Sequence, residues 1–340
     1  MNHRIYFICP TNKSVTGGVK QIYKQVEILR RNGFDAVLLL KKKGKESWFE
    51  SNVVIESNPY IFKKIKYSYQ NKKISFWHKI LLRILRLRSK PLQKDSILVF
   101  PEIYGPRICH IEPLHKKVIF NQNCYYTFEH YQMNEDLSRI PYKGIMATIC
   151  VSADSEKYLK TAFPETPVFR IHLGIDEKIF EFSSAKKKQI AFMPRKLSQD
   201  AVQIINILRN RKNIEGWDFV AIDNKTEREV ANILKESAIF LSFNHQEGFG
   251  LPPAEAMSCG CYVIGYRGQA GTEYFKDEFS TAISEGNIID FVKSVEEIAG
   301  EFQTFQDKGI IASQFIKSHY NLQIEETDIL RTWKSVLNLS

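Results

Sequence analysis

AIFLSFNHQEGFGLPPAEAMSCG, residues 238–260, combines an apolar run, a glycine-rich turn and the pattern of a short helix. The first six residues are apolar apart from Ser242, which is typical of a buried strand. Pro252 and Pro253 suit the first turn of a helix, and Gly260 suits the end of one. Because free backbone N–H groups at a helix N-terminus attract phosphate, this stretch predicts a phosphate-binding turn after a buried strand.

Short apolar runs alternate with helical patterns along most of the chain, on both sides of this stretch. Apolar strands alternating with helices predict parallel sheets that are covered on both faces. We expect strands at residues 5–9, 36–40, 97–100, 118–120, 145–151, 190–193, 219–222, 238–243 and 262–266. The predicted fold class is α/β, with ligands bound beyond the carboxyl ends of the strands.

The chain divides near residues 173–176 (LGID), which are followed by a polar run at 183–188. The strand and helix pattern starts again at Ile190. We therefore expect an N-terminal domain at 1–172 and a C-terminal domain at 173–320. A closing helix at 321–340 completes this prediction, and the two doubly wound, Rossmann-like domains are expected to face each other across a cleft.

Two carboxylates flank the glycine-rich turn. Glu247 lies in the loop, and we expect Glu255 in the first helical turn, where a carboxylate is favoured and can accept hydrogen bonds from ribose hydroxyls. This segment resembles the Glu-x7-Glu signature of retaining, nucleotide-sugar-dependent glycosyltransferases with the GT-B fold. The resemblance implies that Glu247 contacts the transferred sugar and Glu255 the nucleotide ribose. It also implies that 173–320 is the nucleotide-sugar-binding domain and 1–172 the acceptor-side domain. It also places four intervening residues at the donor: Gly248, Phe249, Gly250 and Leu251.

Further segments are similar to that family. Residues 171–176 resemble its interdomain turn, and Thr272 with Glu273 resembles a loop that holds the donor, although an ordinary surface turn explains these two residues as well. Arg195 stands where the family has an arginine that binds the diphosphate, and a guanidinium can neutralise this leaving group without a metal. The family's usual lysine is replaced by Asp200, so Lys196 is the candidate substitute.

In the first domain the pattern is less specific. Gly17 and Gly18 follow the first strand, where glycine permits close approach to phosphates, but a plain strand-to-helix turn explains them too. Asn123 lies where relatives often carry a histidine facing the sugar, and amides can bind sugar hydroxyls. Glu102 ends another strand and is a candidate for binding the acceptor. A structural role for Glu102 and Asn123 is the alternative.

The net charge of +10 is concentrated in one segment. Between Glu56 and Asp95 there are eleven Lys and Arg residues and no acidic residue. A helical stripe of cations beside Trp77 is typical of a helix that lies on an anionic membrane, and the stripe consists of Lys79, Arg83, Arg86 and Lys90. One alternative is an ordinary domain helix with its apolar face in the core and solvated lysines outside. Another is a nucleic-acid surface, although no recognition motif accompanies the charge.

These observations predict a retaining glycosyltransferase that moves a sugar from a nucleotide sugar to a glycan or lipid-linked glycan of the cell surface, in polysaccharide (lipopolysaccharide or capsule) biosynthesis. By resemblance we expect no cofactor and no metal. We expect a cytoplasmic protein, peripheral on the inner face of the membrane, since neither a signal peptide nor a membrane span is evident. The alternatives are a sugar-nucleotide epimerase of related fold and a non-catalytic membrane or nucleic-acid binder derived from a transferase.

Overall fold

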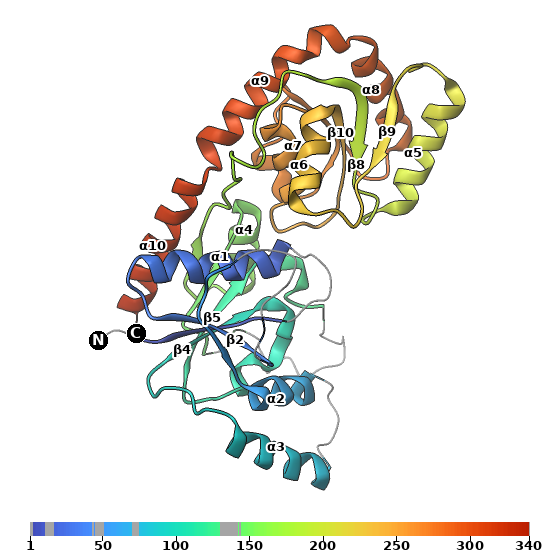
Figure 1. Ribbon diagram of the computed structural model, residues 1–340. Coiled ribbons are helices and arrows are strands. Elements are labelled where there is room, and N and C mark those ends of the chain that lie inside the picture. The colour runs from blue at the N-terminus through green and yellow to red at the C-terminus, as the bar shows by residue number, and fades with distance from the viewer. Residues whose placement is uncertain are drawn as a thin grey trace. The chain divides into compact units, whose positions relative to one another are not determined.

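The computed structural model describes residues 3–10, 17–42, 44, 51–69, 75–129, 142 and 144–339. The chain forms two compact units (Figure 1). Unit 1 consists of Met1–Ile171 and Glu326–Ser340, and unit 2 of His172–Glu325.

Unit 1 contains a parallel sheet with the strand order β3-β2-β1-β4-β5-β6-β7. Its central strands are fully buried because their side chains are apolar on both faces. The strands are β1 (Ile5–Ile8), β2 (Ala36–Leu40), β3 (Ile55–Ser57), β4 (Ile97–Pro101), β5 (Lys116–Asn121), β6 (Ala147–Cys150) and β7 (Val168–Arg170).

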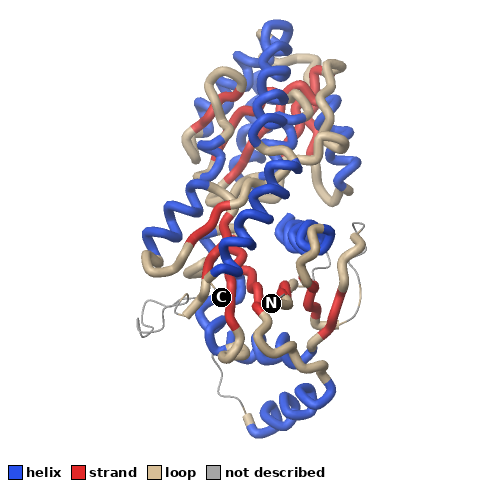
Figure 2. The backbone as a smooth tube through the Cα atoms, turned by 90° about the vertical axis from the view of Figure 1, so that its left-hand side faces the viewer, coloured by secondary structure: helices blue, strands red, loops and turns tan. Residues whose placement is uncertain are grey.

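Helices connect these strands and cover the sheet (Figures 1 and 2). They are α1 (Gly17–Arg31), α2 (Pro59–Tyr69), α3 (Phe76–Arg88), η1 (Glu102–His110), η2 (Cys124–Tyr126) and α4 (Ala153–Ala162). Helix α1 buries an apolar face at helical spacing, formed by Val19, Ile22, Val26 and Leu29. In contrast, α3 has no buried side chain.

Unit 2 contains a smaller parallel sheet with the order β12-β11-β10-β8-β9. All eight residues of the central strand β10 are buried. The strands are β8 (Lys187–Phe192), β9 (Asp218–Ala221), β10 (Ser237–Asn244), β11 (Tyr262–Arg267) and β12 (Ser280–Ile283). The helices are α5 (Ser198–Arg211), α6 (Glu227–Glu236), α7 (Leu251–Ser258), η3 (Ala270–Glu273), α8 (Ile288–Gly300), α9 (Phe302–His319) and α10 (Leu322–Asn338), whose later part belongs to unit 1.

The nine strands expected from the sequence are all present, and so is the parallel α/β organisation of both halves. Three strands were not expected: β3, β7 and β12. Each of them is only three or four residues long and carries polar side chains. They therefore lack the continuous apolar run that marks a buried strand.

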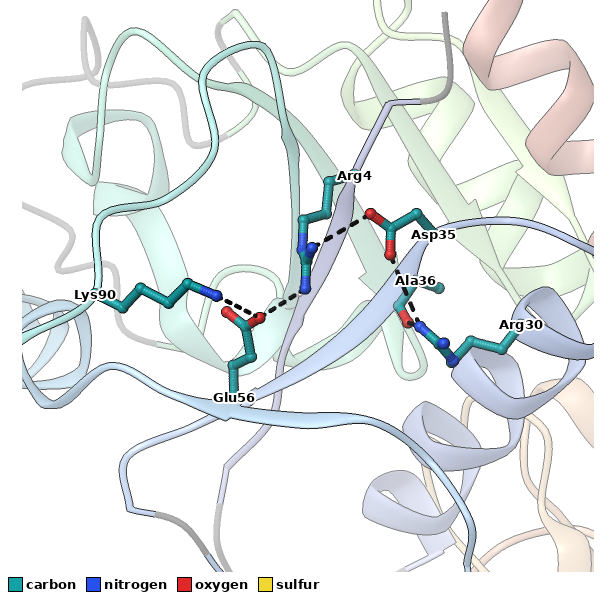
Figure 3. A network of polar contacts seen from close by, with 6 residues as sticks. All are labelled: Arg4, Arg30, Asp35, Ala36, Glu56 and Lys90. Carbon is teal, nitrogen blue, oxygen red and sulfur yellow. Dashed lines mark hydrogen bonds and ion pairs between the residues drawn. The ribbon is translucent and has the colours of Figure 1, made fainter.

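A polar network lies where β1 and β2 begin (Figure 3). The Arg4 guanidinium lies 2.6 Å from the Glu56 carboxylate and 3.4 Å from that of Asp35. The Lys90 Nζ lies 3.2 Å from the same Glu56 oxygen.

Lys90 is therefore not part of the helical stripe expected from the sequence. Helix α3 ends at Arg88 because Lys90 precedes Pro91, and a residue before proline disfavours helical backbone.

Among the described residues, the largest fully buried side chain is that of Trp333, which α10 places in unit 1. The ring centroid of Trp333 lies 5.6 Å from that of Phe7 on β1. Its Nε1 donates to the Gln25 Oε1 of α1 at 3.3 Å. The C-terminal segment is thus part of the core of unit 1. Within the described residues, no helix is long and apolar enough to cross a membrane.

We expect Trp333→Ala to lower the free energy of unfolding by about 3–5 kcal/mol, because it removes a buried indole and leaves a cavity against β1. Urea denaturation followed by near-ultraviolet circular dichroism measures the change. The matched control is Trp77→Ala, since Trp77 is 76% exposed and its loss should change stability little. Equal stability of both variants would contradict this assignment of the core.

Candidate active site

The strand order of unit 2 creates a position suited to ligand binding at the carboxyl ends of its strands. The chain goes from β8 outwards to β9 and then returns to β10 on the other side of β8. At such a switch point the two connections diverge, and a crevice opens beyond the carboxyl ends of the strands. Lys196 follows β8, and Glu247 follows β10. The two segments that carry the predicted catalytic residues therefore start side by side.

The side chains of Lys196 and Glu247 form an ion pair between Nζ and Oε1. Both are partly exposed, at 31% and 21% of the side-chain surface. Arg195, the preceding residue, is exposed in the same turn. The structure thus brings the Glu247 carboxylate and the Lys196 ammonium group together at the switch point, although the two residues lie 51 positions apart in the sequence.

The turn between Glu247 and α7 depends on Gly250. Its φ is +83°, and a Cβ atom there would lie 2.4 Å from Asn244 Nδ2 and 2.7 Å from the Tyr274 hydroxyl. That hydroxyl lies 2.9 and 2.8 Å from the carbonyl oxygens of Phe249 and Gly250. Burial, and then the charge of Glu247, raises the pKa of Tyr274 well above its ordinary value. The neutral phenol therefore holds the turn in place.

Phe249, predicted at the donor, is 3% exposed and packs inside unit 2. Its ring centroid lies 5.3 Å from that of Tyr274 and 5.1 Å from that of Tyr320. The Tyr320 hydroxyl donates to the Glu273 carboxylate at 3.1 Å, while the Thr272 hydroxyl bonds locally to the Gln269 carbonyl. The aromatic cluster thus connects the glycine-rich turn with the loop of Glu273. No sequence pattern marked Tyr274 or Tyr320, because their contacts are made across long sequence separations.

Helix α7 begins at Leu251, and Pro252 and Pro253 lie in its first turn, as expected. The expectation for Glu255 was wrong in one respect. No acidic residue lies in the first turn, because Glu255 is the fifth residue of the helix. The two prolines also remove backbone N–H donors at the helix start. Glu255 lies half-buried one turn further on.

Asp200 has a partner of its own. Its carboxylate accepts a hydrogen bond from the Tyr266 hydroxyl at 2.9 Å, so it fastens the first turn of α5 to β11. Nearby, the loop residue His245 has its Nδ1 2.6 Å from a Glu285 oxygen. Sequence reasoning passed over His245 because a lone histidine carries no motif. Among the described residues, no group of three or more His, Cys, Asp or Glu side chains is placed to hold a metal ion.

Unit 1 brings its own candidates together at a second switch point, between β1 and β4. Gly17 and Gly18 open α1 after β1, and Glu102 follows β4. The Gln122 side chain donates to the Gly18 carbonyl at 3.1 Å. The Glu102 carboxylate accepts the backbone N–H groups of Gln122 and Asn123, both at 3.1 Å. Gln122 therefore links these residues.

Glu102 and Asn123 are both buried, at 5% and 6% exposure. The Asn123 Oδ1 accepts from the Tyr125 N–H at 3.1 Å and caps η2. Burial raises the pKa of the Glu102 carboxyl to about 7, although backbone hydrogen bonds oppose the shift. Both side chains thus shape the loop after β5, and Glu102 changes protonation near neutral pH.

The raised pKa of Glu102 predicts a pH dependence of stability. The folded state retains a proton that the unfolded state, with an ordinary carboxyl pKa, has already lost. The contribution of the Glu102 carboxyl to the free energy of unfolding is therefore present at low pH and is lost as pH rises through about 7. Relative to Glu102→Gln, the wild type should lose up to about 3 kcal/mol between pH 5 and 8. Parallel urea titrations test this, and a difference independent of pH would contradict it.

The chain is similar to known glycosyltransferases. Residues 204–321 match the family model described as Glycosyl transferases group 1. The matched segment contains Glu247 and Glu255. An alpha-1,6-glucosyltransferase from Actinobacillus pleuropneumoniae serotype 7 (strain AP76) is 25% identical over 348 residues, which cover 98% of this chain and 95% of that protein.

Solved structures share the fold at low sequence identity. Sucrose-phosphate synthase from Thermosynechococcus elongatus aligns with a TM-score of 0.70 at 12% identity, over 99% of this chain and 100% of that one. Anabaena HepE in complex with UDP-glucose aligns with a TM-score of 0.67 at 12% identity, over 98% and 99%. The two parallel α/β units are therefore those of the GT-B fold, and the second unit contains the segment that matches Glycosyl transferases group 1.

Proposed function

We propose that this protein is a retaining glycosyltransferase that moves a sugar from a nucleotide sugar to a glycan or lipid-linked glycan of the cell surface. UDP-glucose is the donor to test first. The observation that carries the proposal is the ion pair of Glu247 with Lys196, which follows the exposed Arg195, at the switch point of unit 2. The A. pleuropneumoniae relative is named as an alpha-1,6-glucosyltransferase, and HepE is bound to UDP-glucose. Since UDP-glucose is α-linked, an α-linked product would correspond to retention.

In this proposal the chain's own cations stabilise the leaving diphosphate, and no metal takes part. Arg195 is exposed and can present a planar guanidinium to two phosphate oxygens. Charge stabilisation on the leaving group and positioning of the sugar then provide most of the rate acceleration. Glu102 and Asn123 are proposed to shape the acceptor side in unit 1, with the protein working at the inner face of the cytoplasmic membrane.

The ion pair between Lys196 and Glu247 fits the state before the donor binds. A diphosphate carries more negative charge than a carboxylate, so it competes for Lys196 when the donor arrives. Glu247 is then released to accept hydrogen bonds from the sugar hydroxyls. Donor binding and placement of the catalytic carboxylate are coupled in this way. Lys196 thereby takes the part of the family's lysine that Asp200 replaces.

Glu247 and Glu255 should have separable roles. We expect Glu247→Ala to lower kcat by at least about 100-fold while UDP still binds, because this residue contacts the sugar. Glu255→Ala should weaken UDP binding about 10- to 100-fold, the value of a hydrogen bond to a charged group. Calorimetry with UDP and a transfer assay measure the two effects. The control is Glu215→Ala, an exposed carboxylate at the opposite edge of the sheet; equal loss of UDP binding in both site variants would refute the assignment.

The cations should act on the leaving group. Arg195→Ala should lower kcat by about 100- to 1000-fold, as loss of one charge-stabilising donor does. Lys196→Met should weaken UDP binding, whereas Lys188→Ala, at the start of the preceding strand β8, should change neither kcat nor UDP binding. Steady-state kinetics with and without EDTA provide the measurement. Loss of transfer in EDTA that magnesium restores would show that the metal-free mechanism is wrong.

A further inference from the structure

Helix α3 presents an apolar face to solvent. Phe76, Trp77 and Leu87 are 70%, 76% and 82% exposed. With 3.6 residues per turn, these three positions lie on one side of the helix together with Ile84, which is 41% exposed. Large exposed apolar side chains scattered singly are ordinary, but a contiguous group of them marks an interaction site.

The opposite side of α3 packs on α2. The ring centroids of His78 and Tyr67 lie 4.6 Å apart, and the Arg86 guanidinium lies 6.0 Å from the Tyr60 ring. The helix extends from the end of unit 1 in both views (Figures 1 and 2). Since the apolar face points away from α2, folding of the described chain does not account for it. The alternative of an ordinary helix with its apolar face in the core is therefore wrong.

Cations border this apolar face. Lys79 and Arg83 follow one side of it, and Arg88 lies on the other. Helix α3 contains no acidic residue. Of the eleven cations counted in the surrounding segment, Lys72 and Lys73 lie outside the described residues, and Lys90 is paired with Glu56 (Figure 3). An apolar centre with a cationic border is complementary to an anionic lipid surface, with acyl chains below and phosphates beside the helix.

We infer that α3 is the membrane-docking element of this protein and inserts Phe76, Trp77, Ile84 and Leu87 into the interface of an anionic bilayer. A second copy of the chain fits less well, because its own acid-free helix would meet the same cations. This inference deepens the peripheral location in the proposed function, but it stands without glycosyl transfer because it depends on α3 alone. Attachment by charge alone would end at high salt, whereas insertion leaves binding that salt does not remove.

The test is co-sedimentation of the full chain with vesicles of phosphatidylcholine, with or without phosphatidylglycerol, at low salt and at about 1 M salt, where the Debye length is about 3 Å. We expect binding to anionic vesicles that is weakened but retained at high salt. Trp77→Ser combined with Leu87→Ser should lower the affinity at least about tenfold and abolish the retained part. Lys79→Gln combined with Arg83→Gln should lower only the low-salt binding.

The matched control is Leu114→Ser, because Leu114 is 98% exposed but lies in a turn outside α3; it should bind vesicles as the wild type does. Circular dichroism and UDP calorimetry on every variant show that the fold and the donor site persist. Unchanged vesicle binding by the Trp77 and Leu87 variant overturns the inference, as does equal binding to neutral vesicles. Concentration-dependent dimers that the same variant abolishes would show that a second copy covers the face. Vesicle binding without any transferase activity would leave this inference standing and refute the proposed function.

Discussion

Parallel pairing of the strands is the constraint on which the rest of this structure depends. In each unit the first strand has neighbours on both sides, β2 and β4 around β1 and β9 and β10 around β8. The carboxyl ends of all strands therefore share one edge, and the connections diverge there. Glu247 and Lys196 meet at that edge in unit 2, and Glu102 and Gly18 are linked through Gln122 in unit 1.

The strands that could be predicted from the sequence are those that consist of continuous apolar runs. Examples are β2 and β10, which are buried throughout. Strand β3 reads Ile-Glu-Ser and is held by its ladder with β2, so pairing and not composition decides its conformation. The end of α3 was misplaced for a local reason, because the backbone restriction before Pro91 outweighed the periodicity of the cations.

The candidate site could be predicted as a set of residues but not as an arrangement. The motif placed Glu247 in a turn and prolines at the start of α7, since both follow from local backbone preferences. The ion pair with Lys196 and the contacts of Tyr274 with the turn depend on long-range packing, which spacing alone does not contain. At position 200 the family's usual lysine is replaced by aspartate. In the structure Asp200 accepts a hydrogen bond from Tyr266, and the cation beside Glu247 is that of Lys196.

For α3 the sequence showed two faces, one apolar and one cationic, but not which face would pack against the rest of unit 1. A helix that covers a core normally turns its apolar side inwards, because burial of that side supplies most of its stability. Here α2 packs against the side of α3 that contains His78 and Arg86, and Trp77 and Leu87 remain exposed to solvent. An exposed apolar face favours association with any apolar surface. The bordering cations restrict that choice, since they repel a second copy of this basic chain and attract anionic headgroups.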